Sequence, residues 1–150
     1  MTTLRKGDNA PNFSAKDQDG NLHNLADYKG KKLVVFFYPK ANTPGCTAEA
    51  CDLRDNFDRF QAGNYALLGV SADNAKAQAS FKNKFDFPFP LLADEDKSVI
   101  QAFGVWGPKK FMGKEYDGIH RTTFIIDENG IIEDVIKDVK TKAHAEQILG

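Results

Sequence analysis

The segment LVVFFY at residues 33–38 contains no charged side chain and no alternation of apolar and polar residues. A strand with one face in water alternates, whereas a strand buried on both faces reads as a continuous apolar run. A second run of this kind, YALLGVS, occupies residues 65–71. Two such strands are typical of the centre of an α/β sheet that is covered on both faces.

Shorter strands and several helices surround this core. The dipeptide Asp19-Gly20 favours a tight turn between strands at 13–16 and 21–25. Apolar spacing predicts the remaining elements. These are helices at 74–85, 97–103 and 142–149, and strands at 91–92, 122–126 and 131–136.

Two further segments are interpreted from their glycines, prolines and capping residues. Thr43 can cap a helix with Pro44 at its first position, and Gly63 ends it, which predicts one helix over residues 44–62. Residues 104–119 contain four glycines and a proline, and we expect an irregular surface loop there. The whole order predicts a single domain, residues 1–150, with a mixed central sheet flanked by helices and an N-terminal β-hairpin extension.

Composition limits the class of partner and the compartment. The net charge of −1 gives no reason to expect nucleic acid or an anionic membrane as a partner. No apolar run reaches the roughly 20 residues of a membrane span, and the first residues have no secretory pattern. We therefore expect a cytoplasmic protein, in which two cysteines serve catalysis, redox chemistry or metal binding more often than a permanent disulfide.

The only two cysteines, Cys46 and Cys51, follow the first apolar strand in the segment PKANTPGCTAEAC. Cys46 falls in the first turn of the predicted helix, where free backbone N–H groups and the helix dipole favour a thiolate, the nucleophilic form of cysteine. Pro39 is placed to end the strand and shield the sulfur. The Thr43 hydroxyl could hydrogen-bond the sulfur or an incoming oxygen.

Other interpretations of the cysteines are open at this point. Cys46 could be a small buried apolar residue, and Cys51 could belong to the helix core. The spacing Cys-x4-Cys differs from the Cys-x-x-Cys of dithiol oxidoreductases. No ligand spacing links the three histidines to a metal site, which disfavours a metallochaperone. A Cys–His hydrolase would need one of these histidines beside Cys46: His23, His120 or His144.

The spacing of the cysteines also has a geometric consequence. Residues five apart on an intact α-helix have Cα atoms roughly 8–9 Å apart, from the rise and rotation per residue. A disulfide requires about 4.4–6.8 Å. Cys46 and Cys51 therefore cannot bridge on one regular helix, and a disulfide between them would require local unwinding.

The pattern Pro39-x3-Thr43-x2-Cys46 resembles the active-site signature of the peroxiredoxins. The resemblance extends to Glu49 and to Arg121, which stands at the head of the predicted strand 122–126. The spacing of the two cysteines is similar to that of the bacterioferritin-comigratory-protein, or peroxiredoxin Q, branch.

This resemblance implies a thioredoxin-like fold and a thiol peroxidase without a metal or organic cofactor. Cys46 would be the peroxidatic nucleophile, which reduces hydrogen peroxide or organic hydroperoxides and becomes a sulfenic acid. Cys51 would be the resolving cysteine and form an intramolecular disulfide with Cys46. Thioredoxin or a similar dithiol protein would reduce that disulfide, and we expect a monomer.

The chemistry of the other motif residues agrees with these roles. Arg121 supplies a permanent cation for the thiolate and the peroxide, and Thr43 Oγ1 with the Cys46 backbone N–H could donate as well. Glu49, one helical turn after Cys46, could orient Arg121. The alternative function is a redox sensor or thiol-bearing binding module on the same fold, in which Cys46 is oxidised without turnover.

Overall fold

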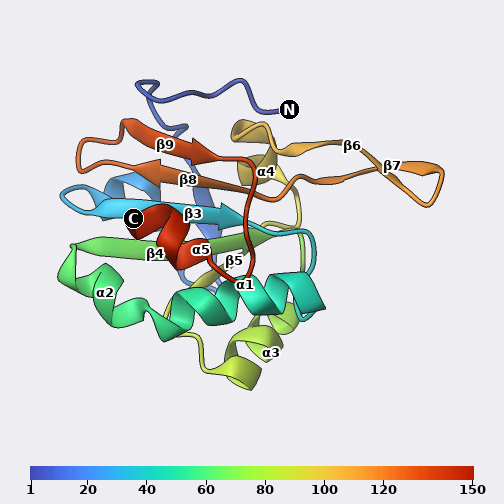
Figure 1. Cartoon of the computed structure of the whole chain (residues 1–150), viewed down its shortest axis with the longest axis horizontal. Helices are drawn as coiled ribbons and strands as arrows, with labels where there is room; N and C mark the ends of the chain where they lie inside the picture. Colours follow the sequence, from blue (N-terminus) through green and yellow to red (C-terminus); the bar gives the residue numbers. More distant parts are fainter.

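A five-stranded mixed sheet forms the centre of the computed structural model, which describes residues 1–150 (Figure 1). The strand order is β5-β4-β3-β8-β9. The pairs β3–β4 and β4–β5 are parallel, and the pairs β3–β8 and β8–β9 are antiparallel. The strands are β3 (Lys32–Phe37), β4 (Tyr65–Ser71), β5 (Leu91–Ala93), β8 (Thr122–Ile126) and β9 (Ile132–Ile136). The two apolar runs thus lie side by side in the sheet interior, as the sequence predicts.

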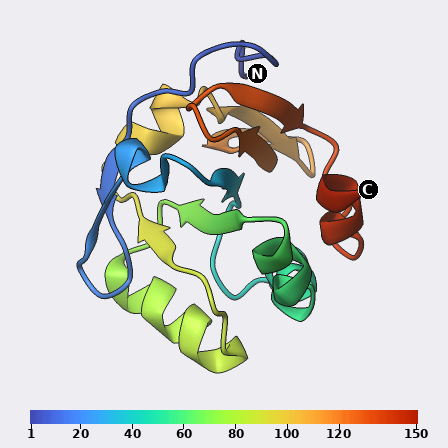
Figure 2. The ribbon, with the colours of Figure 1, turned by 90° about the vertical axis from the view of Figure 1, so that its left-hand side faces the viewer.

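Two hydrophobic clusters cover the two faces of this sheet, and each contains a different set of helices. Figure 2 shows α4 and the N-terminal segment on one side and the other helices on the opposite side. The helices are α1 (Pro44–Asp55), α2 (Phe57–Ala62), α3 (Ala75–Phe85), α4 (Ser98–Ala102) and α5 (His144–Leu149). None of them is both long and apolar enough to cross a membrane.

The predicted N-terminal hairpin is present. Strands β1 (Ser14–Lys16) and β2 (Leu22–Asn24) pair antiparallel, and a short 3-10 helix, η1 (Leu25–Tyr28), leads from β2 toward β3. Gly20 closes the connection in a left-handed conformation, with φ of 82°.

The prediction of an irregular loop at residues 104–119 is wrong. Strands β6 (Trp106–Phe111) and β7 (Lys114–Ile119) form an antiparallel hairpin that projects from the body of the molecule (Figure 1). Its turn residues, Met112 and Gly113, both have positive φ, which is typical of a two-residue hairpin turn. Gly107 and Gly118 lie within the strands, opposite each other, and do not break the pairing, whereas Gly104 precedes β6.

The prediction of one helix over residues 44–62 is also wrong, because the chain breaks at Asn56. The Asn56 side-chain amide donates to the carbonyl of Asp52 at 2.8 Å, and the Asn56 backbone N–H turns to Leu53 instead. The side chain thus takes the acceptor that a continuing helix would use. The result is two helices, α1 and α2, rather than one.

Candidate active site

Cys46 lies in the first turn of α1, directly after the central strand β3. Beyond β3 the backbone N–H of Tyr38 still donates to Val70, and Pro39, which has no N–H, follows half-buried between strand and helix. Cys46 is the third helical residue and is only 2% exposed. The fold therefore places a nearly buried thiol where helix N–H groups lack partners.

Arg121 reaches Cys46 because of the register of the sheet. Strand β8 pairs antiparallel with β3, and Thr122 lies opposite Phe37 at the end of β3 that leads to α1. Arg121 precedes Thr122, and its Nη2 lies 3.3 Å from the sulfur of Cys46 as a hydrogen-bond donor. Two residues 75 positions apart in sequence are thereby brought into contact.

Glu49 holds the other side of the same guanidinium. Its side chain is fully buried, and Oε1 accepts a hydrogen bond from Nη1 of Arg121 at 2.7 Å. Burial raises the pKa of Glu49 to about 7, although the charge and hydrogen bond of Arg121 oppose this shift. Burial lowers the pKa of Arg121, but Cys46 and Glu49 outweigh it and raise that pKa overall. Arg121 thus bridges the sulfur and the carboxylate.

Thr43 occupies the predicted N-cap position but makes no side-chain cap. Its backbone is extended, with φ −98° and ψ 158°, while its hydroxyl donates to the carbonyl of Lys40 at 2.8 Å. The hydroxyl also makes no hydrogen bond to Cys46; the only one to that sulfur comes from Arg121. The expected capping bond, in which the hydroxyl oxygen would accept a backbone N–H of the first turn, is therefore absent.

Cys51 lies on the same unbroken helix as Cys46, and both thiols are free. Cys51 is half-buried and packs against the cluster that contains Cys46. Burial raises its pKa, and the neighbouring Arg54 only partly opposes this effect. Because α1 is regular between the two cysteines, this structure is the dithiol form, in which they cannot bridge.

No histidine hydrogen-bonds Cys46, which removes the Cys–His hydrolase alternative. His23 contacts Asp17 and Tyr28, and His120 contacts the carbonyl of Pro108. No group of three or more His, Cys, Asp and Glu side chains is placed to hold a metal ion.

His144 is the residue of this region that sequence reasoning missed. It is fully buried, and its Nε2 lies 3.5 Å from Oε2 of Glu49. The sequence shows only a lone histidine near the end of the chain. Its contact with Glu49 depends on how α5 docks on α1, and no local pattern encodes that docking.

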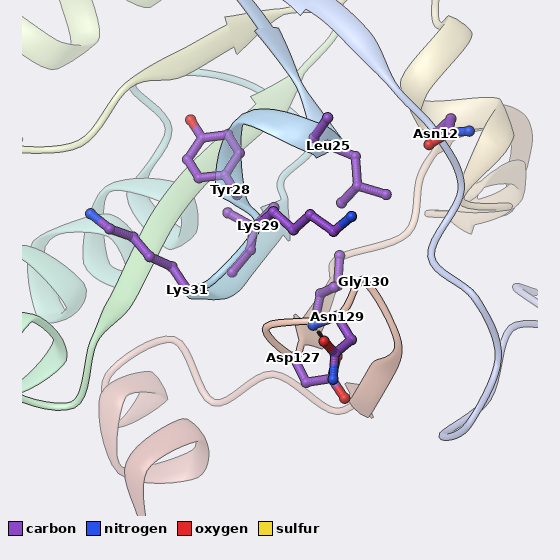
Figure 3. A pocket seen from close by; sticks show the side chains of 11 residues that line it. Asn12, Leu25, Tyr28, Lys29, Lys31, Asp127, Asn129 and Gly130 are labelled. Atoms are coloured by element: carbon purple, nitrogen blue, oxygen red, sulfur yellow. Dashed lines mark hydrogen bonds between the residues drawn. The ribbon is translucent and has the colours of Figure 1, made fainter.

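A separate cavity of about 200 Å³ lies at the opposite end of β3 from Cys46 (Figure 3). Leu33 and Ile126, which pair at that end of the sheet, line it together with Lys29, Tyr28 and Asp127. No thiol lines this cavity. It is therefore not part of the Cys46 site.

Comparison with known proteins agrees with this geometry. The profile of the AhpC/TSA family matches residues 6–135. Peroxiredoxin Bcp of Escherichia coli strain K12 is 50% identical over 149 residues, 99% of this chain and 96% of that protein. The putative peroxiredoxin bcp of Haemophilus influenzae is 45% identical, over 99% of this chain and 96% of the relative.

Solved structures give the same result. A PrxQ variant from Xylella fastidiosa superposes with a TM-score of 0.92 at 33% identity, covering 99% of this chain and 95% of that one. The bacterioferritin comigratory protein of Xanthomonas campestris, studied for its alkyl peroxide reduction activity, has a TM-score of 0.86 at 34% identity, covering 91% and 87%. The chain therefore belongs to the AhpC/TSA family and, within it, to the peroxiredoxins of the bacterioferritin-comigratory-protein, or peroxiredoxin Q, branch.

Proposed function

We propose that this chain is a thiol peroxidase in which Cys46 is the peroxidatic residue. The observation that carries the proposal is the contact of Arg121 Nη2 with the sulfur of Cys46 at 3.3 Å, in the first turn of a helix. A fixed cation and free helix N–H groups favour the thiolate form. The same donors face the place where an attacking thiolate would meet a peroxide.

In the first step the thiolate of Cys46 attacks the terminal oxygen of a hydroperoxide. An S–O bond forms, the O–O bond breaks, and the leaving oxygen takes a proton to become water or an alcohol. Arg121 and the Cys46 backbone N–H stabilise the negative charge that develops on the leaving oxygen. The hydroxyl oxygen of Thr43 can accept a hydrogen bond from the incoming hydroperoxide, because its own proton is donated to Lys40. Pro39 limits the access of water to the sulfur.

In the second step Cys51 resolves the sulfenic acid of Cys46. Its sulfur attacks the oxidised sulfur, an S–S bond forms and the S–O bond breaks, and the hydroxyl leaves as water with the proton of the Cys51 thiol. The step requires α1 to unwind, because its regular form holds the two sulfur-bearing residues too far apart. Glu49 orients Arg121 while the helix is intact.

A dithiol protein such as thioredoxin then returns both thiols to the reduced form. Hydrogen peroxide and organic hydroperoxides are the proposed substrates, and the alkyl peroxide activity of the Xanthomonas relative supports the second class. Since both proposed redox cysteines belong to one chain, the cycle needs no second subunit. We propose a monomer that works in the cytoplasm as one domain, with no nucleic-acid or membrane partner.

The proposal is tested by following peroxide consumption with thioredoxin, thioredoxin reductase and NADPH. Wild type should turn over continuously, and Cys46→Ser should reduce consumption to the uncatalysed background. Cys51→Ser, the matched variant on the same helix, should consume one equivalent and then stop. A single equivalent from wild type would indicate a redox sensor, and full activity of Cys46→Ser would refute the assignment of the nucleophile.

A further inference from the structure

One buried oxygen beside the site lacks a hydrogen bond. Glu49 uses Oε1 for Arg121, whereas its Oε2 has no hydrogen-bond partner although the side chain is inaccessible to water. An unpartnered buried oxygen is costly, so its surroundings require an explanation. The equally buried Nε2 of His144, from α5, lies 3.5 Å away.

The neighbours of His144 determine which ring nitrogen carries its hydrogen. The side-chain amide of Gln147 is oriented by two backbone contacts: Nε2 donates to the carbonyl of Asp138, and Oε1 accepts from the N–H of Lys140, both at 2.8 Å. His144 Nδ1 lies 2.8 Å from that same Oε1. Because Oε1 only accepts, Nδ1 must be the protonated nitrogen.

Neutral His144 therefore presents a lone pair at Nε2. The hydroxyl of Thr123, on β8, lies 2.7 Å from this nitrogen and donates to it. The Oε2 of Glu49 also faces this nitrogen, so two lone-pair atoms meet in a buried space. A single added proton between them supplies the hydrogen bond that Oε2 lacks, and the Thr123 hydroxyl can then turn from donor to acceptor. Burial raises the pKa of Glu49 to about 7 and lowers that of His144, so uptake of this proton falls near neutral pH.

We propose that His144 is a positioning residue of the site, which shares one proton with Glu49 and so sets the charge of the carboxylate that holds Arg121 beside Cys46. Without the shared proton, Glu49 is an anion and forms an ion pair with Arg121. With it, the Glu49–His144 pair is neutral and its attraction for the guanidinium falls. The link to catalysis rests on the proposed function of Cys46.

The other charged groups around the pair do not replace either partner. Asp52, on α1, raises the pKa of His144, but its Oδ2 accepts the backbone N–H of Ala145 at 2.8 Å. Arg121, at the start of β8, lowers the pKa of His144 and cannot take the proton. Thr123 and Gln147 are uncharged. The shared proton thus belongs to Glu49 and His144.

Nitrogen NMR of the protein labelled with ¹⁵N-histidine tests proton sharing without reference to activity. The chain has three histidines, so the spectrum is simple. At high pH, His144 should show the Nδ1–H tautomer, and its titration should move at least one pH unit lower in Glu49→Gln. The signals of His23 and His120 should not move. An Nε2–H tautomer at high pH, or a titration that Glu49→Gln leaves unchanged, would overturn the proposal.

Stopped-flow reaction of the reduced protein with hydrogen peroxide tests the consequence for the site. In His144→Gln the new amide can donate to Oε2 and favour the carboxylate, so the acid limb of the pH–rate profile should move about one pH unit lower. In a Glu49→Gln background the same substitution should cause no further shift. His120→Gln is the matched control, because that ring contacts a loop carbonyl instead.

An equal effect of His144→Gln in both backgrounds would indicate a merely structural role and refute the inference. If no variant and no wild type reacts with peroxide, the proposed function fails. The NMR titration would still decide whether Glu49 and His144 share a proton.

Discussion

Helices α1 and α3 have nearly the same length, 12 and 11 residues, but their ends are held differently. Asn74 caps α3 by accepting the N–H of Ala77 at 2.8 Å, and the left-handed Asp86 closes its other end. In α1 the hydroxyl of Thr43 makes no cap, and the helix ends at Asp55, just before Asn56.

Tertiary contacts, rather than caps, hold α1 in place. Glu49 binds Arg121, Asp52 accepts the N–H of Ala145, and Arg54 donates to the carbonyl of Phe85. A helix held in this way can unwind when those contacts are released, whereas α3 has bonded ends in addition to its own tertiary contacts. The helix that carries both cysteines is thus the one without a side-chain cap at its N-terminal end, where Cys46 lies.

The largest effect is expected for the contact that joins α1 to β8. Arg121→Met removes the cation beside Cys46, and the second-order rate constant with hydrogen peroxide should fall by about 100- to 1000-fold, the usual effect of losing one such donor. Stopped-flow kinetics measures it. Arg59 lies on α2 and is an exposed cation that pairs with Glu146 of α5. The control Arg59→Met should leave the rate unchanged. A small effect of Arg121→Met would separate this residue from the chemistry.

Glu49 gives α1 a pH-dependent stability that α3, which has no acidic residue, lacks. The folded-state pKa of about 7 lies above the ordinary 4.5. This group therefore contributes stability below pH 4.5, and that contribution is lost as the pH rises through about 7. The unfolding free energy of wild type should therefore fall relative to that of Glu49→Gln as the pH rises. From pH 5 to pH 8 the difference should change by about 2–3 kcal/mol in favour of Glu49→Gln.

Urea denaturation at both pH values measures this difference. Glu146→Gln, at an exposed carboxylate on α5, is the control and should show no such trend. A constant difference between Glu49→Gln and wild type would show that Glu49 is ionised in both states throughout this range.

The capping contrast between the two helices can be measured directly. Asn74→Ala removes a formed cap and should cost about 1 kcal/mol of unfolding free energy. Thr43→Ala removes a hydroxyl that caps nothing and should cost only about a few tenths. Chemical denaturation of the reduced proteins gives both values. Equal losses of unfolding free energy in the two variants would contradict the difference in capping between α1 and α3.

The smaller of the two effects on the reaction rate is expected at Gly45, in the first turn of α1. A Cβ there would lie 3.2 Å from Nη2 of Arg121, so the guanidinium would have to shift by a few tenths of an ångström. Gly45→Ala should lower the rate with peroxide by roughly three- to ten-fold, because the donor is misplaced rather than removed. A wild-type rate would show that the position of Arg121 tolerates this displacement.

Much of the fold and the centre of the site could be predicted from local sequence. The apolar runs predict the buried strands, whereas Arg121 is singled out only by the family resemblance and not by the residues around Cys46. The hairpin of β6 and β7 does not follow from its local sequence, because its glycines and proline are typical of a loop. Pairing between strands, which places Gly107 opposite Gly118, is not visible in single-segment composition.

The remaining features depend on contacts between distant segments. The break at Asn56 arises from a side chain that competes for a backbone acceptor, and helix propensity over the whole segment does not show it. The proximity of His144 to Glu49 requires α5 to dock on α1. The burial that raises the pKa of Glu49 comes from the same tertiary packing.

Amide hydrogen exchange of the reduced and the peroxide-oxidised protein tests the central claim most directly. With the Cys46–Cys51 disulfide verified by mass, residues 44–55 of α1 should lose protection, while residues 75–85 of α3 should keep theirs. Peroxide-treated Cys51→Ser, which cannot form the bridge, should retain protection in α1. Unchanged exchange in α1 of the disulfide form would contradict the account, because a regular helix cannot hold that bond.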